Sequence, residues 1–371
     1  MARAQRIDPG SRWRAFAGIG ALGAALGASL GAEVARAAPQ AGTGSATSTS
    51  AEVGPPLSDA ARKSLDAAEA LLDAGDPSKA EAAFAKSEPL APKSPLPWVG
   101  RARAILAGLA LPFDLGSANG DPAKSKRVGE ARKLLAVAEK LGPAYAPAYV
   151  EAGRAALMVG DGAVALGELD RAVVLAPADA EAVSARGVAE LAIGKPELAI
   201  KDLKRAIDLE PKSAVRRRNY ATALLLQGQT EAAVKAYDEA LKLDPTSAGA
   251  RNDLGAALLQ LGDVPRAIKE LELAVKGAPK EPVYRVVLGF AYQMAKRTAD
   301  AEASYQEAIA LDDKRVAAWV NLGSLYVQLG KKDAARAALK KALALDPKEP
   351  RARLMLDDLD APAAAPPPPK K

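Results

Sequence analysis

The sequence predicts an all-α solenoid of stacked antiparallel helix hairpins, because one pattern recurs along it with a period of 34 residues. A closing residue returns at this step: Pro143, Pro177, Pro211, Pro245, Pro279, Asp313 and Pro347. A turn residue lies fourteen residues into most copies: Gly75, Gly160, Gly194, Gly228, Gly262, Lys296 and Gly330. Between these markers the apolar residues are three and four apart, as in Leu322, Leu325, Tyr326 and Leu329, which gives each helix one apolar face.

Counting back from the last copy gives eight copies, which start at Ala61, Pro95, Ala146, Ala180, Ala214, Ala248, Pro282 and Val316. Each copy predicts two helices. The first should end at the glycine, because the chain there adopts a left-handed conformation that is unfavourable for a residue with a side chain. Lys296 is the exception. Small residues of the first helices should let the helices of a hairpin approach closely: Ala68, Ala102, Gly153, Gly187, Ala221, Gly255, Gly289 and Gly323. A larger residue of the second helix should fill the facing hole: Phe84, Leu135, Leu169, Leu203, Tyr237, Leu271, Tyr305 and Leu339.

The pattern resembles the tetratricopeptide repeat (TPR) family. The copy over 316–349 carries the signature residues Trp319, Leu322, Gly323, Tyr326, Ala335, Leu339, Ala342 and Pro347. The resemblance implies about eight units in a right-handed superhelix. It also implies a concave groove, lined by the first helices, that holds an extended peptide or a partner helix.

The chain divides into four segments on composition. Residues 1–37 have arginines, an uncharged run and Ala35-Arg36-Ala37, which predicts a signal peptide, or alternatively an uncleaved membrane anchor. Residues 38–56 predict a disordered linker and 361–371 a proline-rich disordered tail. The solenoid takes 57–360 and ends in a capping helix over 351–360, with Leu354, Met355 and Leu359 covering the apolar end.

The second copy carries an insertion around 109–129. Asp121-Pro122 is a good helix start, so the second helix should run from there to Leu141. The rest, 111–120, predicts a surface loop, either a docking loop or an inert insertion. Asp161, Asp263 and Asp333 lie at the starts of other second helices, where a carboxylate complements free N–H groups.

Composition argues against catalysis. The chain has neither histidine nor cysteine, which removes the usual general base, the thiol nucleophile and the imidazole and thiolate metal ligands. We therefore expect no enzyme activity, no cofactor and no metal. Without residues 1–37 the chain keeps 46 basic and 43 acidic residues, so a nucleic-acid partner is not expected either.

Polar residues at groove-facing positions gather in the later copies. These positions are the second, fifth, sixth, ninth, twelfth and thirteenth of each copy. Asparagine and glutamine amides can pair with a peptide backbone through both N–H and C=O. The candidate partner-binding residues are Arg218, Asn219, Thr222, Asn252, Asp253, Phe290, Gln293, Asn321, Ser324 and Gln328. The alternative is that they are ordinary solvated residues, or, for Phe290, buried between copies. The lysine and asparagine clamp by which some family members grip an acidic C-terminus is not reproduced.

Arg217, Arg251 and Arg285 occupy one column. They predict either a ladder for an acidic partner or aliphatic stems that pack while the charged heads stay hydrated.

The sequence thus predicts an exported, non-catalytic protein-interaction scaffold of the periplasm or cell envelope, with a protein or peptide partner. Two alternatives remain: a membrane-tethered assembly factor that keeps the N-terminal segment, and an enzyme with a cryptic carboxylate site.

Overall fold

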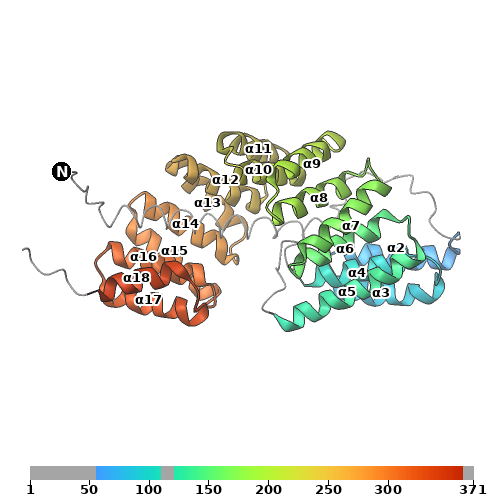
Figure 1. The fold of residues 1–371 in the computed structure, drawn as a ribbon, viewed down its shortest axis with the longest axis horizontal. Helices are drawn as coiled ribbons and strands as arrows, with labels where there is room; N and C mark the ends of the chain where they lie inside the picture. Colours follow the sequence, from blue (N-terminus) through green and yellow to red (C-terminus); the bar gives the residue numbers. More distant parts are fainter. Residues whose placement is uncertain (1–55, 110–120, 362–371) are drawn as a thin grey trace, which may run out of the picture. The chain divides into compact units, whose positions relative to one another are not determined.

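A computed structural model describes residues 56–109 and 121–361, and in these ranges the chain is helical with no strand. The residues form two compact units, divided between Ala250 and Arg251, and each unit is described by itself (Figure 1). The signal peptide, the linker, the loop over 111–120 and the proline-rich tail that the sequence predicts lie outside the described residues, except for a few residues at their edges.

The first unit consists of five helix hairpins (Figure 1). Their helices are α2 (Asp59–Asp73), α3 (Pro77–Ser87), α4 (Leu96–Gly108), α5 (Pro122–Leu141), α6 (Ala146–Met158), α7 (Gly162–Leu175), α8 (Ala180–Ala192), α9 (Pro196–Leu209), α10 (Ala214–Leu226) and α11 (Thr230–Leu243), with a short 3-10 turn η1 (Glu88–Leu90) after α3. The helices of each hairpin pack on each other, and α2, α4, α6, α8 and α10 also contact one another in succession.

The second unit contains α12 (Ala248–Leu261), α13 (Val264–Gly277), α14 (Pro282–Met294), α15 (Thr298–Leu311), α16 (Val316–Gln328), α17 (Lys332–Leu345) and α18 (Pro350–Asp360). Here α14, α16 and α18 contact in succession. Six of the eight predicted start residues, from Ala146 to Val316, are the first residues of helices. The first two copies start within two residues of the prediction, at Asp59 and Leu96.

The turn inside each hairpin confirms the glycine column. Gly75, Gly160, Gly194, Gly228, Gly262 and Gly330 have φ between +69° and +84°. Lys296, the predicted exception, has φ +62° and is the one non-glycine residue with positive φ in the described chain. The turn therefore requires the left-handed conformation whichever residue occupies it.

The small-residue column is also confirmed. A Cβ at Gly153 would lie 2.5 Å from Cγ of Leu169, and a Cβ at Gly289 would lie 2.7 Å from the ring of Tyr305. In each case the glycine is in the first helix and the large residue in the second. Because real Cβ atoms do not approach so closely, the large side chain occupies the space that the glycine leaves.

A second column closes the turn between hairpins. In several copies the residue at the fourth position donates a hydrogen bond to the carbonyl six residues earlier, as Tyr149 Oη does to Pro143 (3.1 Å) and Trp319 Nε1 does to Asp313 (2.8 Å). The same contact joins Arg217 to Pro211, Arg285 to Pro279 and Arg353 to Pro347. Val183 cannot donate, and there Arg205 of α9 reaches the carbonyl of Pro177 instead. These donors satisfy carbonyls that the helix ends leave free.

Helix starts follow the predicted caps with one difference. Asp121 accepts hydrogen bonds from the N–H groups of Ala123 (3.0 Å) and Lys124 (3.1 Å), and α5 runs to Leu141 as predicted. Asp161 and Asp263 cap α7 and α13. Asp333 instead lies in the first turn of α17, where it pairs with Arg336 (3.3 Å).

The capping helix α18 is confirmed, but its apolar face is not the predicted one. Ala352 and Met355 are buried and Leu359 is half-buried against the last hairpin, whereas Leu354 is 44% exposed. Leu354 is one residue off the row that positions 352, 355 and 359 form on one side of a helix. The prediction that Leu354 helps to cover the end was therefore wrong.

No helix in the described part of the chain has the length and apolarity needed to cross a membrane.

Candidate functional site

The surface formed by the first helices, here called the first-helix wall, carries all the candidate residues that the sequence indicates. The wall has two parts, one in each unit. In the first unit Arg218, Asn219 and Thr222 lie on α10, and all three are buried. In the second unit the candidates lie on α12, α14 and α16; most are buried, Gln293 is half-buried and Gln328 is exposed: Asn252, Asp253, Phe290, Gln293, Asn321, Ser324 and Gln328.

Two of these candidates have partners inside their own hairpin. The hydroxyl of Thr222 lies 2.8 Å from Tyr237 Oη, and the side chain also donates to the carbonyl of Arg218. Tyr305 Oη donates to Gln293 Oε1 at 2.9 Å. In both hairpins the large residue of the second helix is a tyrosine, and its buried hydroxyl needs a partner. Thr222 and Gln293 therefore have a structural task whatever else they do.

Two other candidates have polar atoms that are buried without a hydrogen-bond partner. They are Oδ1 of Asn252 and Nδ2 of Asn321. Asn252 is fully buried, with its Nδ2 3.3 Å from Oδ1 of the neighbouring Asp253. An unsatisfied buried amide group costs about 1–3 kcal/mol, so such groups call for an explanation.

The apolar residues beside these amides are mostly core. Val286, Phe290 and Val320 are buried, whereas Met294 at the end of α14 is exposed. Phe290 is thus largely occupied with packing inside the second unit.

The arginine column is neither of the two expected arrangements. Arg217 pairs with Glu239 (3.6 Å), Arg251 with Glu270 (2.5 Å) and Arg285 with Glu307 (3.0 Å). Each glutamate lies on the second helix of the same hairpin. The expectation that the heads are only hydrated was wrong, because these carboxylates bind them.

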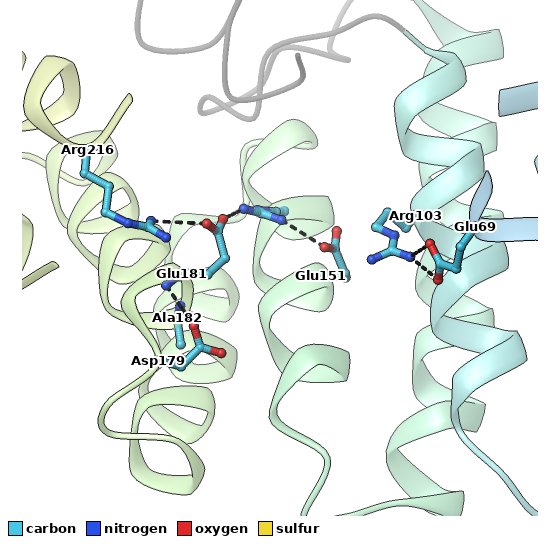
Figure 2. Close-up of polar contacts among 8 residues, drawn as sticks. Glu69, Arg103, Glu151, Asp179, Glu181, Ala182 and Arg216 are labelled. Carbon is cyan, nitrogen blue, oxygen red and sulfur yellow. Dashed lines mark hydrogen bonds and ion pairs between the residues drawn. The ribbon is translucent and has the colours of Figure 1, made fainter. Parts of the chain in front are cut away.

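Sequence reasoning missed a row of charged side chains on the first-helix wall of the first unit (Figure 2). Arg103 of α4 binds Glu69 of α2 through both carboxylate oxygens. Glu151 and Arg154, one turn apart on α6, are joined at 2.9 Å. Arg154 also contacts Glu181 of α8, which accepts from Arg216 of α10 at 3.2 Å. The signal that could have found the row is the pairing of opposite charges 34 or 35 residues apart, as in Glu69 with Arg103 and Glu181 with Arg216.

Both a carboxylate and a guanidinium group of this row keep a buried atom without a hydrogen-bond partner, since Nε of Arg103 is buried in this way too. Glu151 is 5% exposed, and its Oε2 is buried without a hydrogen-bond partner. Desolvation raises the pKa of Glu69 above its usual value although Arg103 opposes the shift. Burial also raises the pKa of the nearby Tyr145 phenol to about 12, and the charges of Arg103, Glu69 and Glu151 all act on it. Tyr145 is therefore neutral at physiological pH.

A second cluster lies between α7, α8 and α9. Arg186 binds Asp202 (2.5 and 3.0 Å) and Asp170 (3.2 Å). Glu190, one turn after Arg186, is buried with an unpartnered Oε2. Desolvation, reinforced by the charge of Asp202, raises the pKa of Glu190 to about 7. The cluster is mixed in charge, and within the described residues no three histidine, cysteine, aspartate or glutamate side chains group so that they could hold a metal ion.

Three stretches of the chain match known repeat families. Residues 150–214 and 316–349 match models described as tetratricopeptide repeat, and residues 221–262 match one described as TPR repeat. No curated protein matches the sequence.

One of the similar solved structures shows the same fold, with a TM-score above 0.5. The chain is similar to the crystal structure of the APC/C hetero-tetramer Cut9–Hcn1, with a TM-score of 0.61 and 16% identity over 82% of this chain and 60% of that one. It thus spans 60% of that protein's length. MamA from Desulfovibrio magneticus RS-1 has 26% identity and a TM-score of 0.42 over 46% of this chain and 97% of its own. Pseudomonas aeruginosa pilF has 20% identity and a TM-score of 0.49 over 57% of this chain and 97% of its own.

The matched stretches, the glycine turns and the small-to-large packing columns lead to one conclusion. The chain belongs to the tetratricopeptide-repeat proteins, an all-α solenoid class that serves as a scaffold for protein interactions.

Proposed function

We propose that this protein binds an extended peptide along its first-helix wall, as a non-catalytic scaffold of the cell envelope. The observation that supports this most is a set of buried polar atoms on the wall that lack a partner, which includes Glu151 Oε2, Asn252 Oδ1 and Asn321 Nδ2. These three residues occupy the fifth or sixth position of their copies, on first helices. A peptide backbone offers both a donor and an acceptor to such atoms.

Burial does not prevent this binding. The terminal torsion of asparagine is broad, so the amide can turn to meet a bound partner. In the unbound protein the unsatisfied groups destabilise the fold, and a bound peptide removes that cost. The same unsatisfied groups would therefore lower the stability of the unbound protein and raise its affinity for the peptide.

The test uses the full chain and a displayed library of random twelve-residue peptides. Retained peptides are synthesised with a fluorophore, and their dissociation constants are measured by anisotropy for the wild type and for the double variant Asn252→Ala, Asn321→Ala. Losing two amide contacts should weaken binding by about tenfold or more. The matched control is Lys269→Ala with Lys340→Ala, two exposed residues of the second helices α13 and α17, which should leave binding unchanged.

Equal binding by the amide variant and the wild type would show that Asn252 and Asn321 do not contribute to peptide binding. Failure to retain any peptide would remove peptide binding altogether.

The envelope setting in this proposal comes from residues 1–37 alone, whose arginines, uncharged run and Ala35-Arg36-Ala37 match a signal peptide. Mass spectrometry of the N-terminus in the native host tests it. A chain that begins at Ala38 supports export with cleavage, whereas a chain that keeps the segment supports the tethered assembly factor.

A further inference from the structure

Glu151 of α6 is a buried acidic side chain on the wall of the first unit that its surroundings satisfy only in part. Its Oε1 accepts a hydrogen bond from Arg154 at 2.9 Å, but its Oε2 has none. The residue is 95% buried, being 5% exposed. A carboxylate in such a place needs a second donor, because a buried charge is costly unless it is paired and hydrogen-bonded.

The row around Glu151 has one negative charge in excess. The contacts described above connect Glu151 to Arg216, and Arg216 also pairs with Glu210 at 2.8 Å. The Glu69–Arg103 pair lies beside them as a separate pair (Figure 2). Together the members of the row comprise four carboxylates and three guanidinium groups: Glu69, Glu151, Glu181 and Glu210 with Arg103, Arg154 and Arg216. One additional cation would balance the charge of these groups.

The outward face of the row is also acidic. The side chains of Glu69 and Glu181 are 44% and 45% exposed, whereas those of Arg154 and Arg216 are 12% and 8% exposed. The guanidinium groups of Arg154 and Arg216 thus lie beneath the surface, that of Arg103 is 34% exposed, and the carboxylates of Glu69 and Glu181 are the most exposed of these groups. Figure 2 shows Glu151 on α6 facing the Glu69–Arg103 pair of α2 and α4, with no bond drawn between them.

Tyr145 adds an aromatic group to this place. It is half-buried against the core that α4, α5 and α6 form, and the charges of Glu69, Arg103 and Glu151 act on its hydroxyl. A neutral phenol beside two carboxylates suits a cation, which both the ring face and the carboxylates attract.

We propose that the surface made by Glu69, Tyr145, Glu151 and Glu181 binds a basic side chain, lysine or arginine, of an extended partner segment. The proposal rests on the proposed function and names the chemistry of the partner. The chain of the partner lies across the exposed carboxylates, and its long basic side chain reaches Oε2 of Glu151. The terminal torsion of the Glu151 carboxylate is broad, so Oε2 can turn toward the cation while Oε1 keeps Arg154.

The experiment sequences the peptides that the full chain retains from the random library, in parallel for the wild type, Glu151→Gln and Glu231→Gln. Glutamine keeps the shape of Glu151 and an acceptor for Arg154. Glu231 of α11 is exposed, and its substitution makes the same change of net charge. A lysine or arginine should be enriched at one peptide position by the wild type and by Glu231→Gln, and not by Glu151→Gln.

A retained peptide is then resynthesised with its basic residue replaced by citrulline or norleucine. This change in the peptide should lower the affinity of the wild type about tenfold. It should change the affinity of Glu151→Gln only slightly, since the basic residue and Glu151 act as a pair. Thermal melts of both variants should match the wild type within a few degrees, which excludes unfolding as the cause.

Peptides that bind and depend on Asn252 and Asn321 but show no basic preference would overturn this inference and leave the proposed function standing. A basic preference that survives Glu151→Gln would overturn it too, because the cation would then be bound elsewhere. If the wild type retains no peptide, both proposals fall.

Discussion

Leu271 of α13 occupies the space that a side chain at Gly255 of α12 would need, since a Cβ there would lie 2.5 Å from Leu271 Cγ. We predict that Gly255→Leu forces the two helices apart and costs about 1–3 kcal/mol of unfolding free energy or more. The loss should be felt mostly by the neighbouring hairpins, because each repeat contacts only its neighbours. Urea unfolding followed by circular dichroism measures it.

The control is Gly167→Ala in α7, where nothing lies within 4 Å of an added Cβ. It should stabilise the protein by up to about 1 kcal/mol through helix propensity. A silent Gly255→Leu would show that the hairpin is not held by this contact.

Lys296 adopts φ +62° at the turn where the other hairpins have glycine. Because the left-handed conformation costs an L-residue about 1–2 kcal/mol, Lys296→Gly should raise the unfolding free energy by about 1 kcal/mol. Thermal unfolding checks this. The reciprocal change Gly330→Lys, at φ +69°, should lower stability by a similar amount. A destabilising Lys296→Gly would mean that the lysine side chain makes a contact worth more than the strain.

The hydroxyl of Tyr149 donates to the carbonyl of Pro143 across the turn between two hairpins. Tyr149→Phe removes that donor from a residue that is almost fully buried, and should cost about 1 kcal/mol. Tyr220→Phe is the control, because the Tyr220 hydroxyl has no hydrogen bond within the described residues. Equal melting temperatures for the two variants would show that the contact does not stabilise the turn.

Glu190 makes stability depend on pH. Burial, with the charge of Asp202 next, raises its pKa from 4.5 to about 7, so the folded protein holds this proton more tightly than the unfolded chain. The contribution of protonated Glu190 to folding stability is fully present below pH 4.5 and is lost as the pH rises toward 7. Desolvation and the charges of Asp202 and Asp170 oppose the charged form. Arg186 and Lys195 reduce the effect.

We expect the unfolding free energy of the wild type to fall by about 1–3 kcal/mol between pH 5 and pH 8 because of Glu190, and Glu190→Gln should abolish this fall. Urea titrations of both proteins at the two pH values test this. Parallel pH profiles for the variant and the wild type would assign the dependence to other groups.

The fold could be predicted from the sequence because it rests on columns of single residues. A glycine such as Gly160 or Gly262 fixes a turn by itself, and a glycine such as Gly255 fixes a contact with the residue sixteen places later. Both constraints are local and return every 34 residues, so the sequence displays them directly.

The site could be predicted only in part. Position in the repeat places Thr222 and Asn321 on first helices, and they lie on α10 and α16. It does not indicate which atoms are covered: Thr222 turned out to bind Tyr237, whereas Nδ2 of Asn321 has no partner. In the row through Glu151 and Arg154, three members share the ninth position of the first three copies: Glu69, Arg103 and Arg154. The row was missed because Glu151, Glu181 and Arg216 lie at other positions, so the ion pairs do not repeat as one column.

The central claim is that a polypeptide lies against the first helices. A photoreactive amino acid at Gln328, exposed at the end of α16, tests it most directly, with the same group at the exposed Lys340 of α17 as the comparison. A retained peptide is irradiated with each full-length variant, and the cross-links are mapped by mass spectrometry. We predict cross-links from position 328 and none from position 340. Cross-links from position 340 alone, with the peptide still bound, would contradict the account.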